Sequence, residues 1–409
     1  MRGSVGTPVY AGAKPVSAYP EKNICITGIG QSRISRAAES SALSLTIDAA
    51  MGAIKDAGLR REDIDGMSTW PGGLGDGTGF SPIGIPALQD ALRLKLGWYA
   101  STRETSGQFG AIFNAIAAIN AGLCRHVLVF RTMYQATARK QGLVNASFQP
   151  GGRVHDKMIW HAPYHAYVAA TQQALYFARY VHESGIREEQ VAQIAINGRR
   201  NASLNPSAVY RKTITLDEYL ASPIITSPLR IFDCDVPIDG STAIILSHRD
   251  DAKGLPNPLT YFEALGTNMQ YRNSWSQLQE LATQAQPEVA AMMWNRTDLK
   301  PKDVQVAELY DGFSFHTINW LENFGFCERY GAGDFIDGGQ RISLEGELPI
   351  NTNGGALSAG RMHAYGQVHE ACVQLWGRGG ERQVKSNPRV AALSTAGGPL
   401  AGCFLLVRE

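Results

Sequence analysis

Two stretches of the chain combine polar, aromatic and glycine residues in a pattern suited to chemistry. The first is residues 308–316, with the sequence ELYDGFSFH. The pattern predicts a strand that ends at Leu309 and a helix that begins near Ser314. Tyr310 and Asp311 would then lie at the carboxyl end of a strand, where α/β proteins build their sites. The stretch thus offers a phenol and a carboxylate as candidate acid–base groups.

The second stretch is residues 353–366, with the sequence NGGALSAGRMHAYG. Its glycines, Gly354 and Gly355 among them, let the backbone approach a ligand closely. The loop then presents three side chains that can carry charge or move a proton at the start of a predicted helix: Arg361, His363 and Tyr365. Each of them alone is more often structural than catalytic. Two such stretches at equivalent ends of one sheet favour a site.

The densest basic cluster precedes both stretches in the sequence. It consists of Arg199, Arg200, Arg211 and Lys212. Such a cluster is usually a solvated face. It could also clamp the phosphates of a carried cofactor, and the residues alone leave both interpretations open. The formal net charge of the whole chain is only +1. We therefore expect no binding to nucleic acid or to an anionic membrane surface, and any anionic ligand must be met locally.

Several common site motifs are missing. The six cysteines form no CxxC pair and no cluster with zinc spacing, so we expect free thiols and no metal site. There is no GxGxxG after the first strand, no P-loop, no HExxH and no GxSxG. No stretch approaches the roughly 20 apolar residues that cross a bilayer. We expect a soluble, cytoplasmic protein that begins with a flexible tail, residues 1–22.

The elements that must position the candidate residues are predicted to occur twice. Leu59 and Leu299 each end a helical pattern and are each followed by a charged tetrapeptide and a strand. Two glycine-opened helices, in residues 106–130 and 365–398, each lead into a further strand. Each half thus reads as strand, helix, strand, helix, strand, and we expect helices to cover a mostly parallel sheet. The fold class predicted is α/β.

A segment of different character separates the halves. We place the first half at residues 23–130, the insertion and its return at 131–258, and the second half at 259–409. The insertion is dense in aromatic residues: Trp160, Tyr164, Tyr167, Tyr176, Phe177 and Tyr180. These side chains would suit a bulky apolar substrate, but an ordinary core or a dimer contact is the default interpretation.

In these motifs the chain resembles the thiolase superfamily, and within it the sterol-carrier-protein branch. The resemblance runs over about residues 23–408 and rests on ITGIG, NPSA, SPLRIFDCDVPIDGSTAIILS, ELYDGFSF and NTNGGALSAG. It implies the thiolase fold, a duplicated α-β-α-β-α layered sandwich with an inserted loop domain over a coenzyme A site. The basic cluster then gains weight as a coenzyme A contact, together with Gly354, Gly355 and Ser358.

The chain departs from the thiolase pattern at each catalytic motif. Glu104 opens the sequence Glu-Thr-Ser-Gly where a thiolase has its nucleophilic cysteine, and a carboxylate cannot accept the acyl group as a thiolate does. Arg361 stands at the position of the activating histidine of the thiolase Gly-His-Pro motif. The second catalytic cysteine of a thiolase corresponds to a position in the sequence STAGG of residues 394–398, which contains no cysteine. Cys403 lies beyond it and is expected in the last strand. We therefore expect no thiolase activity.

One group of the superfamily, the steroid side-chain aldolases, also lacks the cysteine. The resemblance to it implies retro-aldol cleavage of a β-hydroxyacyl-CoA to a ketone or aldehyde and a shorter acyl-CoA. The coenzyme A thioester is then the substrate, and no permanent cofactor is expected. Tyr310 matches a catalytic tyrosine of this group and His363 matches a histidine, whereas Arg361 stands where a second tyrosine is found.

These matches suggest roles for the candidate residues. Tyr310 is assigned as acid/base, with Tyr365 or His363 as its partner and Asp311 beside it. Backbone N–H groups of the glycine loops and Arg361 are candidates for the oxyanion site. Glu104 is either a second base or a carboxylate that stabilises a helix start.

The resemblance also implies partners. We expect at least a homodimer, or a heterotetramer with a small OB-fold, zinc-ribbon protein. Two other classes of function stay open. The chain could be a non-catalytic acyl-CoA or lipid carrier or structural subunit of a thiolase-like complex, or an acyltransferase whose partner supplies the nucleophile.

Overall fold

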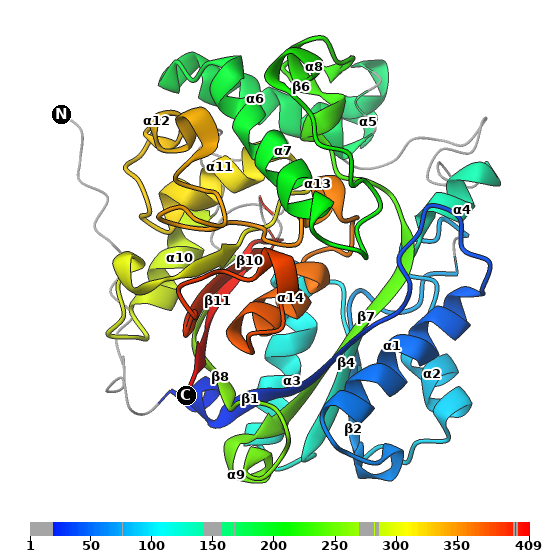
Figure 1. The fold of residues 1–409 in the computed structure, drawn as a ribbon. Helices are drawn as coiled ribbons and strands as arrows, with labels where there is room; N and C mark the ends of the chain where they lie inside the picture. Colours follow the sequence, from blue (N-terminus) through cyan, green and yellow to red (C-terminus); the bar gives the residue numbers. More distant parts are fainter. Residues whose placement is uncertain are drawn as a thin grey trace.

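The computed structural model describes residues 19–75, 77–142, 158–164, 166, 168–269, 282, 286–395, 397 and 400–409. In this part of the chain one large sheet runs through the molecule (Figure 1). Its strands, in spatial order, are β3 (Trp98–Ser101), β2 (Gly66–Thr69), β4 (His126–Tyr134), β7 (Asp239–His248), β1 (Ile24–Gln31), β8 (Thr260–Thr267), β11 (Gly402–Arg408), β10 (Val390–Thr395) and β9 (Val306–Glu308). Cys403 lies in β11, as expected.

The pairing of the strands is mixed. β2 pairs in parallel with β3 and β4, and β9 with β10. The central neighbours, from β4 through β7, β1, β8 and β11 to β10, are all antiparallel. The prediction of a mostly parallel sheet is therefore wrong. One cause is visible in the sequence, because the link from Thr395 to Gly402 is shorter than the dozen or so residues of a parallel crossover.

Helices form three layers around the two halves of the sheet. The long helices are α1 (Ala42–Asp56), α2 (Ile85–Leu92), α3 (Gly110–Asn120), α10 (Gln286–Trp294), α11 (Ser314–Asn323) and α14 (Tyr365–Leu375). One buried cluster joins α1 and α2 to strands of the first half, and another joins α10 and α11 to strands of the second half. A third cluster joins α3 and α14 to strands of both halves, and these two helices lie in the middle of the molecule (Figure 1). The predicted α-β-α-β-α sandwich is confirmed.

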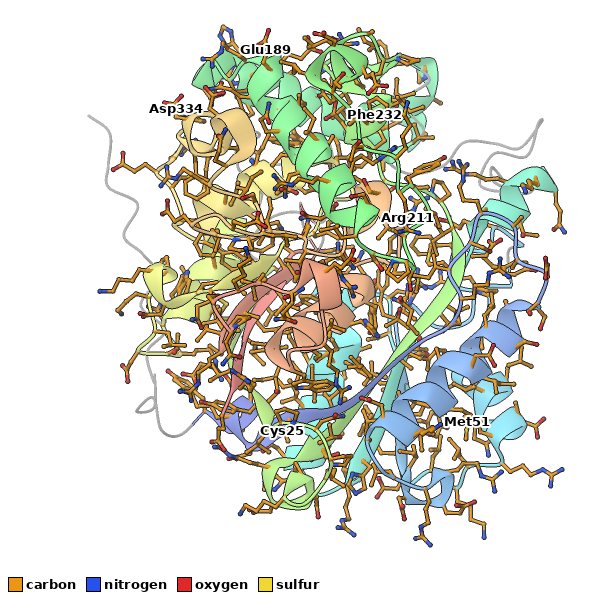
Figure 2. All side chains as sticks on the ribbon, viewed as in Figure 1. Cys25, Met51, Glu189, Arg211, Phe232 and Asp334 are labelled. Atoms are coloured by element: carbon orange, nitrogen blue, oxygen red, sulfur yellow. The ribbon has the colours of Figure 1, made fainter. Side chains whose placement is uncertain are left out.

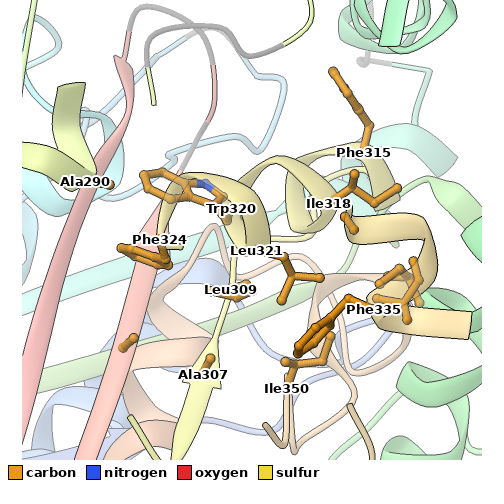
Figure 3. Packing of buried hydrophobic residues seen from close by; sticks show 14 of the residues in the cluster. Ala290, Ala307, Leu309, Phe315, Ile318, Trp320, Leu321, Phe324, Phe335 and Ile350 are labelled. Atoms are coloured by element: carbon orange, nitrogen blue, oxygen red, sulfur yellow. The ribbon is translucent and has the colours of Figure 1, made fainter. Parts of the chain in front are cut away.

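The core of the second half shows how the outer helix α11 packs against the sheet. Trp320 and Leu321 of α11 and Phe324 directly after it share one buried cluster with Ala307 in β9 and Leu309 just after it, and Trp320 lies beside Ala290 in Figure 3. The rings of Trp320 and Phe324 are 4.9 Å apart between centroids. Burial of such large apolar side chains is the main force that fixes β9, and with it the position of Tyr310.

The two charged turns predicted from the repeat have the same hydrogen bond in both halves. The 3₁₀ turns Arg61–Asp63 and Pro301–Asp303 precede β2 and β9, respectively. In the first, the N–H of Arg60 donates to Asp63 Oδ2 at 2.8 Å. In the second, the N–H of Lys300 donates to Asp303 Oδ2, also at 2.8 Å. The same carboxylate closes the same turn in both halves.

Helix α1 lies unusually close to β1. A Cβ atom added at Gly28 would lie 2.4 Å from the carbonyl oxygen of Ala53, and one at Gly30 would lie 2.2 Å from that of Ala49. No side chain fits at such distances, so the two glycines set the spacing between strand and helix.

After β4 comes the short helix α4 (Gln135–Lys140), which lies apart from the elements that follow it (Figure 1). Those elements form a separate lobe, drawn in green: α5 (Met158–His161), α6 (Ala169–Ser184), α7 (Glu188–Ser203), α8 (Leu216–Leu220), β5 (Ile224–Thr226) and β6 (Leu229–Arg230). Its aromatic residues Tyr176, Phe177 and Tyr180 are buried; Phe177 stacks on Phe315 of α11, and the Tyr180 ring packs against Phe315 at a tilt. These three are core residues, the default interpretation. Tyr164 is exposed, while Tyr167 and the side chain of Trp160 lie outside the described residues.

The remaining short helices are α9 (Arg249–Ala252), α12 (Ala332–Ile336) and α13 (Gly355–Ser358). All six cysteines are free, and Cys234 and Cys327 are partly exposed. Among the described helices, none combines the length and the apolar character needed to cross a bilayer.

Candidate active site

Three segments that are distant in sequence are hydrogen-bonded to one another at the edge between the lobe and the second half. Segment 234–237 leads into β7, and the N–H of Asp235 donates to the carbonyl of Gly312 at 3.2 Å. The N–H of Arg361 donates to the carbonyl of Val236 at 2.9 Å. These bonds bring the loop after β9 and the loop before α14 together through a third segment that the sequence analysis did not single out as a site.

A cavity of about 740 Å³ opens at this junction. Its cationic lining residues are Arg36, Arg139, Arg199, Lys212 and Arg361. Its other lining residues are Val168, Ala169, Ala170, Tyr210, Ile225, Ile231, Phe232, Cys234, Asp235, Val236, Pro237, Phe313 and Leu357. A smaller hollow of about 390 Å³ shares Arg36, Arg139 and Pro237 with it and adds Lys140. One wall is thus cationic and much of the rest is apolar.

Asp235 and Arg361 form an ion pair in the lining of this cavity. Their closest oxygen and nitrogen are 3.3 Å apart, and the two side chains are 10% and 17% exposed. Burial raises the pKa of Asp235 to about 6, although the nearby cations Arg361 and Arg139 oppose the rise. The Nε of Arg361 is buried and has no hydrogen-bond partner within the described residues.

Tyr310 lies directly behind the ion pair. Its side chain is 7% exposed, and it is not among the residues that line the cavity. The phenol lies against Gly312, where an added Cβ would be only 2.6 Å from Tyr310 Oη. Burial and the Asp235 charge raise the pKa of Tyr310 above its usual value, against the effect of Arg361. The phenol is therefore a proton donor at neutral pH, not a ready base.

Asp311 serves a structural role in this arrangement. One carboxylate oxygen accepts from the N–H of Ala356 at 2.8 Å and from Gln367 Nε2 at 2.9 Å. The other accepts from the N–H of Leu357 at 3.2 Å. Burial raises the pKa of Asp311 to about 7, with the two backbone hydrogen bonds opposing. The carboxylate holds the short helix α13 in place.

His363 is paired with a buried arginine from β4. Arg131 Nη2 donates to His363 Nδ1 at 3.0 Å, and the guanidinium lies over the rings of Trp70 and Phe80. Because arginine can only donate, Nδ1 must accept and the ring hydrogen must sit on Nε2. Burial, then Arg131 and Arg361, lower the pKa of His363 well below its usual value. His363 is a neutral donor, not a base.

Tyr365 and Glu104 do not share the cavity. Tyr365 begins α14, is fully buried, and its hydroxyl donates to the carbonyl of Gln108 at 3.2 Å. Glu104 is exposed in a bend ahead of the 3₁₀ turn Gly107–Phe109, which precedes α3. Of the six residues predicted as catalytic, Arg361 alone lines the cavity within the described part of the chain, with Tyr310 next to it.

The predicted coenzyme A contacts divide into two groups. Arg199 and Lys212 line the cavity, and the Arg199 guanidinium lies 4.7 Å from the ring centroid of Tyr210. Arg200 instead donates to Asn197 and Arg211 to the carbonyl of Ser203, and neither lines the cavity. Figure 2 labels Arg211 and Phe232 on the lobe that contains α7.

The glycine loop lies one layer below the cavity. Gly354 and Gly355 have positive φ angles, and Gly354 packs against Ala202 of α7. The hydroxyl of Ser358 is buried without a hydrogen-bond partner in the described structure, while its neighbour Leu357 lines the cavity. No cluster of three or more metal-ligating side chains occurs among the residues described.

Sequence reasoning missed Arg36, Arg139, Asp235 and Arg131. Arg36 and Arg139 are isolated charges, and only folding brings them beside Arg199. Asp235 stands inside the motif FDCDVPIDG, which was used for the resemblance but not for the site. Arg131 offered a signal that could have been used, because a charge in the middle of the apolar strand sequence HVLVFRTMY is costly unless it has a purpose.

Comparison with known proteins supports the fold and the family. Residues 267–407 match the family described as thiolase C-terminal domain-like. The chain is 29% identical over 392 residues to a steroid side-chain-cleaving aldolase of Thermomonospora curvata, over 93% of this chain and 97% of that protein. It is also 29% identical, over 93% of this chain and 98% of that one, to the 17-hydroxy-3-oxo-4-pregnene-20-carboxyl-CoA lyase of Mycobacterium tuberculosis.

A solved structure gives the same result. The Ltp2-ChsH2(DUF35) aldolase superposes with a TM-score of 0.79 at 25% identity, over 95% of this chain and 98% of that chain. The resemblance drawn from the motifs is thereby confirmed. The matched domain, the near full-length relatives and the shared fold all agree with a thiolase fold and with similarity to the cysteine-less aldolases of the thiolase superfamily.

Proposed function

We propose that the protein is an acyl-CoA retro-aldolase, a carbon–carbon lyase that cleaves a β-hydroxyacyl-CoA whose acyl group is a steroid side chain. The observation that carries the proposal is the part of the cavity wall formed by an ion pair, where the described residues offer a carboxylate and a guanidinium but no ionised thiol. Asp235 and Arg361 form this pair, and Tyr310 lies behind them. Cys234 also lines the cavity, but burial raises the pKa of this thiol to about 12, so it is protonated at neutral pH.

The two walls of the cavity suit the two parts of a coenzyme A thioester. Arg36, Arg139, Arg199 and Lys212 offer charge-assisted hydrogen bonds to phosphate oxygens. Ile225, Ile231, Phe313 and Leu357 offer apolar contact to the pantetheine arm and the acyl group. The thioester would then end at Arg361, whose guanidinium lines the cavity and can donate to the developing enolate oxygen.

Retro-aldol cleavage needs the groups found at this part of the cavity. A base takes the proton of the β-hydroxyl, the Cα–Cβ bond breaks, and its electrons move into a thioester enolate. Tyr310 then donates a proton to the α-carbon, for which its raised pKa suits it. The products are a ketone or aldehyde and a shortened acyl-CoA, and no covalent intermediate forms.

The relatives support the substrate class and a partner. One is named for steroid side-chain cleavage and one for lyase action on a steroid carboxyl-CoA. The name of the solved aldolase includes a DUF35 component. We infer that this chain acts as a dimer together with a small OB-fold protein of the DUF35 kind.

Tyr310→Phe tests the function. It should leave acyl-CoA affinity within a few-fold, and it should lower cleavage by about 10²–10⁴-fold, the range for loss of a general acid. The assay follows the ketone and the shorter acyl-CoA by mass spectrometry, with the DUF35-type partner present and absent.

Tyr261→Phe removes the same hydroxyl from a half-buried tyrosine of β8 and should cleave normally. Near-normal turnover by the Tyr310 variant would remove the phenol from the mechanism. If the wild-type protein binds acyl-CoA but cleaves none with or without the partner, the carrier or structural-subunit interpretation is correct.

A further inference from the structure

Asp235 is the one acidic residue among the described side chains that line the cavity. Its position is set by backbone bonds on both sides, from its own N–H to Gly312 and from the N–H of Val236 to the carbonyl of Ala356 at 3.0 Å. From this fixed segment its carboxylate pairs with Arg361, and the charges of both residues act on Tyr310. Neither the motif match nor the relatives' names assign it a role.

We propose that Asp235 is the general base that removes the β-hydroxyl proton of the substrate. The proposal rests on the retro-aldolase function and assigns the general base, which that function requires. Arg361 stands where the related aldolases are expected to have a second tyrosine, and the arginine cannot act as a base because it stays protonated. The carboxylate paired with it can.

The hydrogen bonds of the neighbouring carboxylates show why Asp235 is different. Asp233, two residues earlier, accepts from three donors: the Tyr219 hydroxyl, whose hydrogen is shared between the two carboxylate oxygens at 2.9 and 2.8 Å, Ser314 Oγ at 2.7 Å and the Arg230 N–H at 2.8 Å. Asp311 is engaged by Ala356, Leu357 and Gln367. Both carboxylates are used to hold the structure.

Asp235 has capacity left. A carboxylate has about four lone-pair positions, and the described structure gives Asp235 one side-chain contact, the 3.3 Å ion pair with Arg361. The remaining positions face the cavity that it lines. A hydroxyl group of a bound ligand is the kind of donor that such an oxygen accepts.

The proton balance closes without any further reactant. The β-hydroxyl proton moves to an Asp235 oxygen while the O–H electrons form the carbonyl and the Cα–Cβ bond breaks. Tyr310 protonates the α-carbon of the enolate and becomes a phenolate. The proton on Asp235 then passes to that phenolate, which is its neighbour across Gly312, and both groups return to their starting states.

Asp235 could instead serve only as the counter-ion of Arg361. The two roles differ in what a small carboxylate added from solution can do. In Asp235→Ala the cavity gains room, so that formate can supply a base there. A base role predicts that formate restores cleavage in a concentration-dependent way.

The test uses the full chain with its DUF35-type partner and a β-hydroxyacyl-CoA. Asp235→Asn should lower kcat at least 100-fold while acyl-CoA affinity changes less than about threefold. Formate should raise the kcat of Asp235→Ala at least tenfold and leave wild type unchanged. Asp217→Asn, an exposed change of the same type on α8, is the matched control. Retention of kcat within fivefold in Asp235→Asn would overturn the proposal.

The pH profile of the wild-type protein provides a measurement that needs no variant to fold. The charged or titratable groups that interact with Asp235 are Arg361, Arg139, Tyr310, Cys234 and Asp311. The pKa of Asp311 is about 7 and so lies in the same range, but this carboxyl does not line the cavity. Ionisation of the base then predicts that kcat falls below about pH 6, and a flat profile from pH 5 to 8 would count against Asp235. If wild type cleaves nothing, the proposed function itself fails, a result distinct from an active Asp235→Asn variant.

Discussion

At the scale of single residues, Arg131 is the most unusual feature of the molecule. It is fully buried in β4, and burial lowers the pKa of its guanidinium to about 9. Its one side-chain hydrogen-bond partner within the described residues is the neutral His363, and its Nε is unpartnered there. A buried charge without a carboxylate costs several kcal/mol. The arginine is a positioning residue that fixes the His363 tautomer, with its hydrogen on Nε2.

Replacement of Arg131 should therefore separate stability from activity. Arg131→Met removes the buried charge but keeps apolar contact with Trp70 and Phe80, so the free energy of unfolding should stay the same or rise by about 1–3 kcal/mol. The kcat should fall by about tenfold because His363 loses its fixed tautomer. NMR of labelled histidine should show one Nε2–H species in wild type and a mixture in the variant.

Arg131→Lys is the matched control, since it keeps a donor in the strand without the planar guanidinium. It should retain part of the single-tautomer signal. A loss of several kcal/mol of stability in Arg131→Met, with the His363 signal unchanged, would show that the arginine serves the fold only.

At the scale of elements, the site depends on the four-residue helix α13 (Gly355–Ser358) and on the Asp311 carboxylate at its start. The N–H groups at the beginning of any helix lack partners within the helix, and Asp311 satisfies two of them. A Cβ at Gly355 would lie 2.0 Å from Asp311 Oδ2, and Gly355 has a φ of 62°. The glycine and the carboxylate therefore form one device that sets the position of Leu357.

Asp311→Asn should damage this device without removing a proton carrier from the cavity. The amide can accept at one oxygen only, so at least one buried N–H loses its partner, at a cost of about 1–3 kcal/mol. Chemical denaturation should show this loss, and Gly355→Ala should show a loss in the same direction. Asp217→Asn should leave the unfolding free energy unchanged, and equal stability of Asp311→Asn and wild type would contradict the assigned role.

The elements themselves were largely predictable, whereas their partners were not. The start of α11 at Ser314 and of α14 near Tyr365 followed from glycine positions and apolar spacing, which are local signals. The backbone hydrogen bond from Asp235 to Gly312 has no signal in the local sequence, since any extended segment can form such a bond. For the same reason the sequence could pair Tyr310 with Tyr365 or His363, but could not identify Asp235 as its neighbour.

At the scale of the whole molecule, the near-neutral net charge conceals a strongly cationic cavity. Lys and Arg together number 38 against 37 Asp and Glu, yet one acidic side chain faces five basic ones among the described lining residues. Composition is blind to such separation, because Arg36, Arg139 and Arg199 come from different segments. The repeated halves, by contrast, could be recognised because each carries its own charged turn in sequence.

The cationic wall predicts how binding of the substrate responds to charge. Arg139→Gln and Arg199→Gln should each weaken coenzyme A binding by about tenfold, equal to about 1.4 kcal/mol, through loss of a charge-assisted contact. Affinity for the wild-type protein should fall with added salt, and each variant should show a smaller salt dependence. Isothermal titration at several ionic strengths measures both effects.

Lys95→Gln removes an exposed cation that lies outside the cavity, and it is the control for net charge. It should bind coenzyme A as wild type does. Salt-independent affinity, or equal affinities for all three variants, would place the phosphates elsewhere.

The contact of Gly28 and Gly30 with α1 changes what the ITGIG motif can tell a reader. Those glycines occur because Ala49 and Ala53 leave no room for a side chain, and neither lines the cavity. The motif therefore reports how a strand and a helix are spaced, whatever reaction the protein carries out. A search for relatives that weights it heavily will collect enzymes of the same build and different chemistry. Sorting them by reaction requires the residues at 104, 235, 310 and 361 instead.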